Sequence, residues 1–189
     1  DDVIVIPFND EPALERALAS REVACFIVEP VMENIGICLP EPGYLEAVRE
    51  ISTRYGTLLI FDEVKTGITA GLGGATKKLG VTPDLITLAK SIGGGFPVGA
   101  FGGKAEYMNL ITTGEVLHLG TYNGNPLVMA AAKATLTEAC TPDAIDRAIA
   151  ARSDDPVAHF NRGNALLAQK RFEEALASYN VALALRPIY

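Results

Sequence analysis

The chain has 189 residues, of which 49% are hydrophobic and 21% are charged, a balance typical of a folded globular protein and not of a disordered one. Its 23 acidic and 16 basic residues leave a net charge of −7, and an acidic chain without a basic run is a poor ligand for nucleic acid. No apolar run approaches the roughly 20 residues of a membrane-spanning helix. The first residues carry no basic segment, so we expect no secretory signal.

Charge and glycine divide the chain into two unlike parts. Residues 1–140 carry 17 acids against 10 bases and 17 of the 18 glycines, whereas residues 141–189 have no net charge. We therefore expect one domain over 1–140 and a smaller one over 141–189. The three cysteines, Cys25, Cys38 and Cys140, are too widely spaced for a disulfide framework or a zinc site, which favours a reducing, cytoplasmic compartment and no metal.

The first part alternates the patterns of strands and helices. We expect a first helix that is capped near Asp10 and ends near Arg21, followed by a strand at Val23–Val28, a helix over Tyr44–Tyr55 and a strand at Leu58–Phe61. Two more strands are expected at Leu85–Leu88 and Val98–Phe101, and an Ala-rich helix over Pro126–Cys140. The strand over Val23–Val28 is apolar throughout, so we expect it to be buried on both faces, with Cys25 in the core. This alternation predicts an α/β fold whose mostly parallel sheet has helices on both faces and binds ligands beyond the carboxyl ends of its strands.

The second part has the pattern of a helical hairpin. From Pro156 to the last residue there are 34 residues, the length of one tetratricopeptide repeat, which this segment resembles. We expect two helices that touch at Gly163 and Ala175 and stop at Pro187. The buried stripe is expected to comprise Phe172, Tyr179, Ala182, Leu183 and Leu185. Residues 143–155 resemble the second helix of a preceding repeat, and so short an array is not expected to be stable alone. A generic amphipathic helix pair would share the small-residue pattern.

An acid and an amine follow two of the predicted strands. Asp62 comes directly after the strand at Leu58–Phe61, and Lys90 follows the strand at Leu85–Leu88, with Gly93–Gly95 close behind. Because parallel strands end at the same edge, the two side chains are expected to face one pocket. A desolvated lysine there would attack a carbonyl, and an aspartate would hold a ring nitrogen protonated, as pyridoxal phosphate chemistry requires. A structural ion pair at the rim of the sheet would have the same spacing.

Four motifs raise this hypothesis above the structural alternative: IVEPVMENIG, LLIFDEVKTG, GVTPDLITLAKSIGGGFPVGAFGG and GTYNGNPLVMAAAKATL. On these motifs, the run from Val23 to Thr135 resembles the large domain of class III (fold type I) pyridoxal phosphate-dependent aminotransferases, and within them the glutamate semialdehyde aminomutase-like branch. The resemblance implies part of that large domain, a mostly parallel sheet with flanking helices, followed by the tetratricopeptide-like hairpin. It also implies a pyridoxal phosphate cofactor and a homodimer.

The resemblance assigns roles to five residues. Lys90 matches the lysine that forms an aldimine with the cofactor and moves the substrate proton, and Asp62 matches the acid at the pyridine nitrogen. Val64 matches the residue packed on the ring face, and Asn34 looks like the polar residue near the ring hydroxyl. Thr121 matches the hydroxyl that binds the cofactor phosphate of the neighbouring subunit. The implied activity is that of a transaminase or aminomutase on an amino acid or amino aldehyde.

Neighbouring residues are expected to have structural roles. Glu29 is expected to brace the loop that carries Asn34, and Gly93–Gly95 to shape the backbone. His118 is expected to be a solvated loop histidine.

The sequence departs from the family at both ends. We find no Gly-Ser/Thr turn that would cradle the phosphate and no small C-terminal domain, so we expect a truncated protein that is weakly active or inactive alone and has exposed sheet edges. Tyr122-Asn123 after Thr121 favours a transaminase over an aminomutase. The alternative function is an interaction module, in which the tail binds a peptide or a helix and the first 140 residues are a degenerate scaffold.

Overall fold

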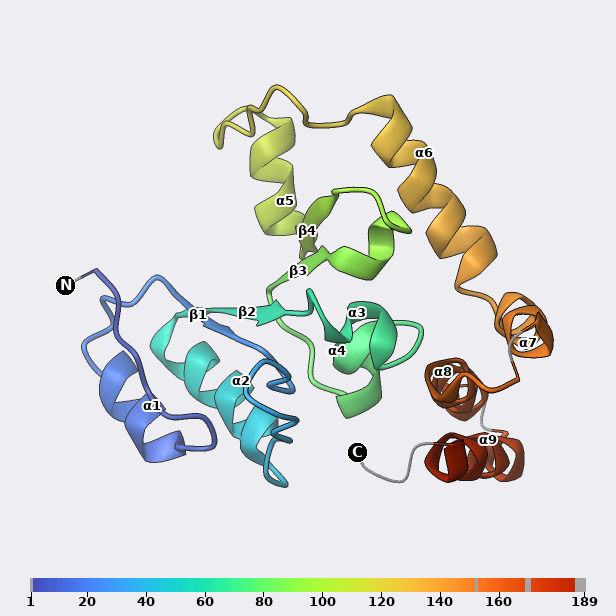
Figure 1. The fold of residues 1–189 in the computed structure, drawn as a ribbon. Helices are drawn as coiled ribbons and strands as arrows, with labels where there is room; N and C mark the ends of the chain where they lie inside the picture. Colours follow the sequence, from blue (N-terminus) through green and yellow to red (C-terminus); the bar gives the residue numbers. More distant parts are fainter. Residues whose placement is uncertain (1, 152, 169–170, 186–189) are drawn as a thin grey trace.

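The computed structural model describes residues 2–151, 153–168 and 171–185 (Figure 1). In chain order its elements are α1 (Glu11–Leu18), β1 (Cys25–Val28), α2 (Tyr44–Tyr55), β2 (Leu58–Asp62), α3 (Thr66–Thr69), α4 (Gly74–Leu79), β3 (Leu85–Ala89), the 3-10 helix η1 (Lys90–Gly93), β4 (Gly99–Gly103), α5 (Ala105–Thr112), α6 (Pro126–Ala134), the π-helical turn η2 (Thr135–Ala139), α7 (Pro142–Ala151), α8 (Pro156–Ala168) and α9 (Phe172–Leu185). In this part of the chain no helix is long and apolar enough to cross a membrane.

The four strands form one sheet in the order β1-β2-β3-β4. The pairs β1–β2 and β2–β3 are parallel, and β4 runs antiparallel to β3. The predicted fold class, a mostly parallel sheet with flanking helices, is thus confirmed. The predicted Ala-rich helix is also present, although its last turn widens into η2 between Thr135 and Ala139.

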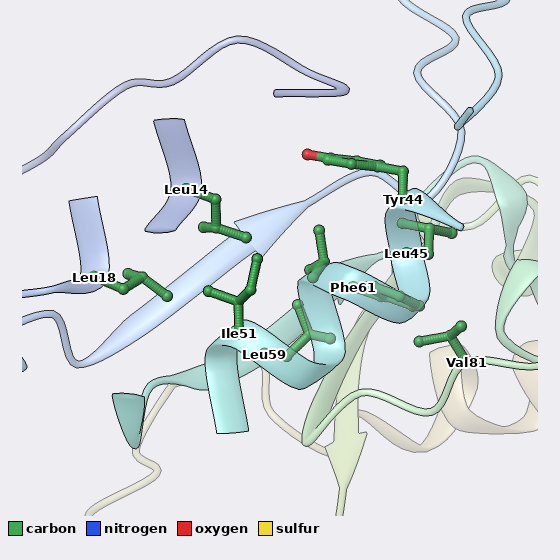
Figure 2. Packing of buried hydrophobic residues seen from close by; sticks show 9 residues of the cluster. Leu14, Leu18, Tyr44, Leu45, Ile51, Leu59, Phe61 and Val81 are labelled. Carbon is green, nitrogen blue, oxygen red and sulfur yellow. The ribbon is translucent and has the colours of Figure 1, made fainter. Parts of the chain in front are cut away.

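The hydrophobic core lies between one face of the sheet and helices α1 and α2. The core residues are Leu14, Leu18, Tyr44, Leu45, Val48, Ile51, Leu59, Phe61 and Val81 (Figure 2). Tyr44, Val48 and Ile51 fall on one side of α2 because they recur at helical spacing. The strand β2 contributes Leu59 and Phe61, alternate residues that point to the same face. This packing fixes the position of β2, whose last residue is Asp62.

The opposite face of the sheet is more open, which corrects two expectations. On β1, Cys25 is exposed and Ile27 is 56% exposed, so this strand is not buried on both faces and Cys25 is not a core residue. The reason is topological, because β1 forms an edge of the sheet and α1 and α2 pack against the other side (Figure 1). An apolar run alone does not distinguish an edge strand from a central one.

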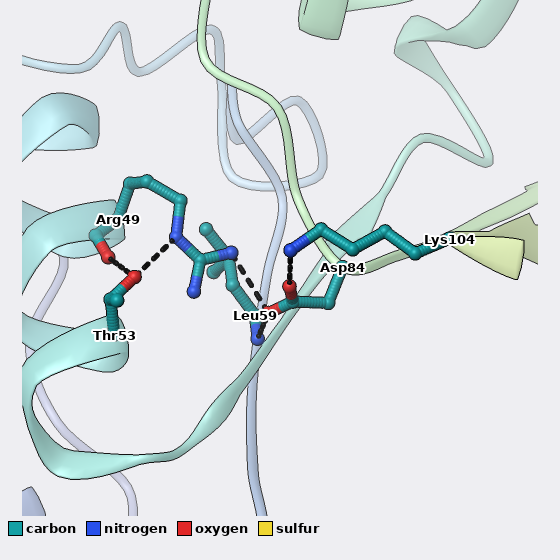
Figure 3. Close-up of polar contacts among 5 residues, drawn as sticks. All are labelled: Arg49, Thr53, Leu59, Asp84 and Lys104. Carbon is teal, nitrogen blue, oxygen red and sulfur yellow. Dashed lines mark hydrogen bonds and ion pairs between the residues drawn. The ribbon is translucent and has the colours of Figure 1, made fainter. Parts of the chain in front are cut away.

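Asp84, in the loop before β3, joins three elements (Figure 3). Its carboxylate accepts hydrogen bonds from the Leu59 backbone N–H at 2.7 Å and from Arg49 of α2 at 2.8 Å. It also pairs with Lys104, just beyond β4, at 2.6 Å. Burial by itself would raise the pKa of Asp84, but the bonds from Lys104, Leu59 and Arg49 outweigh it and hold the pKa below its ordinary value. Asp84 therefore stabilises the fold as an ionised group.

The tail forms the expected helical hairpin, α8 and α9, preceded by α7. Gly163 lies against the Tyr179 ring, and Ala175 and Ala182 are buried, as predicted for the contact between the helices. Three residues of the predicted buried stripe are instead largely exposed: Phe172 (57%), Leu183 (52%) and Leu185 (41%). Phe172 and Leu183 are at helical spacing from Tyr179, which packs on α8, yet they stay exposed, so helical spacing identified apolar positions but not which of them are covered. Pro187 lies outside the described residues.

The tail also contacts the first part of the chain. Asn164 of α8 is 5% exposed, and its Nδ2 donates to the Thr69 carbonyl at the end of α3, at 2.8 Å. Tyr179 of α9 donates its hydroxyl proton to Asn164 Oδ1 at 2.8 Å. A short repeat array needs neighbouring structure to cover its faces, and here α3 provides part of that contact to α8.

Candidate functional site

Asp62 and Lys90 lie at the same edge of two adjacent parallel strands. Asp62 ends β2 and is paired in register with Thr87 of β3. The strand β3 continues to Ala89, and Lys90 follows it as the first residue of η1. The geometry therefore brings the predicted acid and the predicted amine to one end of the sheet, where open α/β sheets bind ligands.

The backbone turns sharply at Lys90. Ala89 is fully extended, whereas Lys90 has a φ of +52°, in the left-handed region that a residue with a side chain rarely adopts. Such outliers persist where the surrounding structure holds them, and they cluster at functional sites. The Lys90 side chain is exposed, which corrects the expectation of a desolvated lysine, and within the described residues it forms no hydrogen bond or ion pair. Its amine is therefore available to a ligand.

Asp62 is oriented by its own turn. Its Oδ1 accepts a hydrogen bond from the Val64 backbone N–H at 3.0 Å, and both side chains are half-buried. Among the described contacts, the second carboxylate oxygen of Asp62 has no protein donor. Val64 thus lies beside Asp62 in the same turn, and its role at the ring face stays a prediction.

The glycines after Lys90 shape the backbone. A Cβ on Gly93 would come within 2.6 Å of the Val98 side chain, so only glycine fits between η1 and this residue. Gly94 and Gly95 have φ values of +57° and +99°, which glycine adopts without strain. The structural role expected for Gly93–Gly95 is therefore confirmed.

Asn34 lies on a loop that Glu29 braces. Glu29 accepts from the Asn34 side-chain amide at 3.2 Å and from the Glu33 backbone N–H at 3.3 Å. Asn34 itself is exposed and forms an isolated bridge with Gly36. The expected bracing by Glu29 is confirmed, and the role of Asn34 stays a prediction.

Thr121 lies in the connection between α5 and α6, in an exposed turn. The turn is ordered by its neighbours, because His118 contacts Asn123 at 3.2 Å and packs edge-on against Phe101 at 5.1 Å between ring centroids. In the described structure no hydrogen bond joins Thr121 to Asp62 or Lys90. The role of Thr121 at the site of a neighbouring subunit stays a prediction. His118 is exposed, as expected.

Glu63 is the residue of this region that sequence reasoning left without a role. It is 1% exposed, and its Oε2 accepts from the Ala75 backbone N–H at 2.6 Å and from the Thr66 hydroxyl at 3.0 Å. Its Oε1 accepts from the Thr76 backbone N–H at 2.9 Å and from the Thr76 hydroxyl at 2.5 Å. The only signal in the sequence is its position next to Asp62, because its donors lie up to 13 residues away.

A hollow of about 260 Å³ lies elsewhere, between α4 and α8. Its lining residues are Ala70, Gly71, Leu72, Gly74, Lys77, Lys78, Asn164 and Leu167. It contains neither Asp62 nor Lys90. Within the described ranges, no cluster of His, Cys, Asp and Glu side chains has the arrangement of a metal site.

Comparison with known proteins relates the chain to two families. Residues 9–155 match the class-III aminotransferase family, and residues 156–189 match the tetratricopeptide repeat. The chain is 55% identical over 132 residues to a glutamate-1-semialdehyde 2,1-aminomutase from Methanocorpusculum labreanum, a match that covers 69% of this chain and 32% of that protein. The chain thus spans about a third of the length of the curated relatives it matches.

Solved structures show the same relationship. The fold is similar to that of a glutamate-1-semialdehyde aminomutase from Pseudomonas aeruginosa in complex with PMP, with 34% identity and a TM-score of 0.69 over 82% of this chain and 37% of that one. It is also similar to an omega-transaminase from Sphaerobacter thermophilus, with 40% identity and a TM-score of 0.71 over 85% of this chain and 37% of that one. The family match covers well over half of the chain and includes both Asp62 and Lys90. The chain therefore belongs to the class-III aminotransferase family and carries a tetratricopeptide repeat at its C-terminal end.

Proposed function

We propose that this chain carries the strand-end part of a pyridoxal phosphate site and that its protein is a transaminase or aminomutase acting on an amino acid or amino aldehyde. The observation that carries the proposal is the placement of Asp62 and Lys90 at one edge of adjacent parallel strands, within a class-III aminotransferase segment. We propose residues 1–140 as the cofactor-binding part and residues 141–189 as the repeat-like tail.

The residues at this edge fit the cofactor. Lys90 offers an exposed amine with no protein partner among the described contacts, and Asp62 has one carboxylate oxygen that accepts no described hydrogen bond. The glycine turn after Lys90 lets the backbone approach a planar ring. When bound, pyridoxal phosphate supplies an aldehyde and a ring that accepts electrons.

Each predicted residue then has a distinct task. Lys90 would hold the cofactor at its aldehyde carbon through Nζ, with the carbonyl oxygen leaving as water, and its amine would carry a proton to and from the substrate carbon. Asp62 holds the proton on the ring nitrogen with its carboxylate, and Val64 covers one face of the ring. Asn34 contacts the ring hydroxyl, and Thr121 donates a hydrogen bond to the phosphate in the site of the second subunit of a homodimer.

Binding by this chain alone is expected to be weak. Thr121 is the one phosphate ligand that we predict, whereas phosphate sites usually combine several backbone N–H groups with a helix dipole. Each charge-assisted hydrogen bond contributes about 1.5–3 kcal/mol, so the loss of two or three such bonds lowers the affinity by several orders of magnitude.

The test is a titration of the folded chain with pyridoxal phosphate, followed by visible absorbance and by trapping with borohydride. We expect an absorbance band and a borohydride-stable adduct at Lys90, both absent in Lys90→Ala. Lys78→Ala, a change of another exposed lysine on α4, is the matched control and should retain both signals. A folded wild-type chain that forms no adduct at saturating cofactor, or an adduct that persists in Lys90→Ala, would refute cofactor binding by this site.

A second candidate function is supported by the surface of α9. Phe172 (57% exposed), Leu176 (60%) and Leu183 (52%) recur at helical spacing on α9 and form an exposed apolar stripe, beside Tyr179 that packs on α8, which a peptide or helix could cover. Leu176→Glu in the full chain should abolish capture of a partner that the wild-type chain retains, with a measurable change in dissociation constant for the purified pair. Equal affinity of both proteins for that partner would exclude this surface.

A further inference from the structure

The turn that carries the predicted ring-nitrogen acid is held by Glu63 through both its backbone and its side chain. The Glu63 N–H donates to the Thr87 carbonyl at 3.0 Å, which extends the β2–β3 pairing one residue beyond Asp62. The Glu63 carbonyl accepts from the Gly67 N–H at 2.8 Å, at the start of α3. The backbone on the C-terminal side of Asp62 is thus tied both to β3, three residues before Lys90, and to α3.

The side chain adds a third connection, to α4. The buried carboxylate accepts from two backbone N–H groups of the first turn of α4, Ala75 and Thr76, and from two threonine hydroxyls. A buried carboxylate is expensive unless hydrogen bonds replace its water, and these four donors replace it. The approach is close, because a Cβ on Gly74 would collide with Glu63 Oε2, so only glycine is accommodated there.

The connection reaches Asp62 through Val64. Val64 directly follows Glu63, and its N–H donates to Asp62 Oδ1 at 3.0 Å. The direction of the Val64 N–H therefore depends on the Glu63–Val64 peptide unit, which Glu63 anchors. If the Glu63 carboxylate lost its bonds to α4, the turn would keep only its two backbone connections, to Thr87 and Gly67, and the Val64 N–H would orient Asp62 less firmly.

We propose that Glu63 is a positioning residue, whose buried carboxylate fixes the turn after β2 so that the Val64 N–H holds the Asp62 carboxylate in place. Glu63 acts through Val64 and does not touch the cofactor. The proposal rests on the proposed function only for the role of Asp62. The anchoring itself is a property of the chain without any ligand.

The test is amide hydrogen exchange, measured by NMR on the full chain without cofactor. Glu63→Gln replaces one acceptor oxygen with an amide, and we expect exchange at Val64 to become about tenfold faster, as the loss of a hydrogen bond to a charged group implies. Exchange at Ala75 and Thr76 should accelerate as well. Glu50→Gln, the same change at an exposed glutamate of α2, is the matched control and should leave all three amides unchanged.

The response of Val64 separates positioning from simple anchoring. If Glu63 only secures α4, Ala75 and Thr76 exchange faster in Glu63→Gln while Val64 does not, and the proposal is overturned. If Glu63→Gln does not fold, the pair Thr76→Ala and Thr76→Ser decides. We expect Val64 exchange to increase severalfold in Thr76→Ala and to return to the wild-type rate in Thr76→Ser; an unchanged rate in Thr76→Ala overturns the proposal.

These measurements are independent of cofactor binding. A chain that forms no adduct at Lys90 would refute the proposed function, yet Val64 exchange would still report whether Glu63 orients Asp62. Conversely, normal adduct formation combined with an unresponsive Val64 would refute the positioning role alone.

Discussion

Replacing Asp84 with asparagine tests how much of the fold depends on one buried carboxylate. The Asp84 side chain is 4% exposed and has three donors, the Leu59 N–H, Arg49 and Lys104 (Figure 3). Asp84→Asn keeps the shape and one acceptor oxygen, which can still accept from Leu59. It removes the charge that faces the two cations and places an amide donor against one of them.

The expected loss of stability follows from the exposure of the two cations. Hydrogen bonds to charged groups contribute about 1.5–3 kcal/mol each to stability. Because the Arg49 side chain is 23% exposed, water replaces part of what it loses, and we place its bond to Asp84 near the lower end of that range. Lys104 is 48% exposed, so water replaces most of what it loses, and its pair contributes about 0–1 kcal/mol. We therefore expect Asp84→Asn to lower the free energy of unfolding by about 1.5–2.5 kcal/mol.

Urea denaturation as a function of pH is the appropriate assay. The pKa of Asp84 is lower in the folded chain than in the unfolded chain. The contribution of its carboxylate to the free energy of unfolding is therefore complete above the unfolded-state pKa and is lost as the pH falls through the folded-state pKa. The wild-type chain and Asp84→Asn should thus differ at pH 7 and converge as the pH falls below about 4. Asp2→Asn, at an exposed position, is the control. A difference under about 0.5 kcal/mol at pH 7, within the range of ordinary surface substitutions, would refute the reasoning.

Two further substitutions test packing. Phe61→Ala removes a core side chain that is 0% exposed and should lower the free energy of unfolding, measured by urea denaturation, by about 3–5 kcal/mol. A loss below about 1 kcal/mol would mean that α2 does not pack on β2 as described. Gly163→Ala brings a methyl group against the Tyr179 ring and should destabilise the α8–α9 pair by about 1–3 kcal/mol, visible as faster amide exchange in α9. Ala158→Gly, also on α8, controls for helix propensity, and wild-type exchange in Gly163→Ala would contradict the close contact.

Local sequence patterns determined the elements and much of the candidate site. The helix over Tyr44–Tyr55 was predicted to the residue because its apolar spacing, Gly43 before it and Gly56 after it are all local signals. The strands that precede Asp62 and Lys90 were predicted for the same reason, and parallel pairing then places both residues at one edge. Gly163 and Ala175 were identified as contact residues because close helix packing admits only small side chains there.

Only the tertiary structure decided which apolar residues are covered and which polar groups meet. Cys25 and Phe172 lie in apolar patterns that fit a core, yet the first is on an edge strand and the second, on α9, stays 57% exposed. The role of Glu63 depends on donors from α3 and α4, and the strained φ of Lys90 depends on the turn into η1. Burial and hydrogen bonding depend on which segments meet after folding, and that information is not contained in the spacing of residues along one segment.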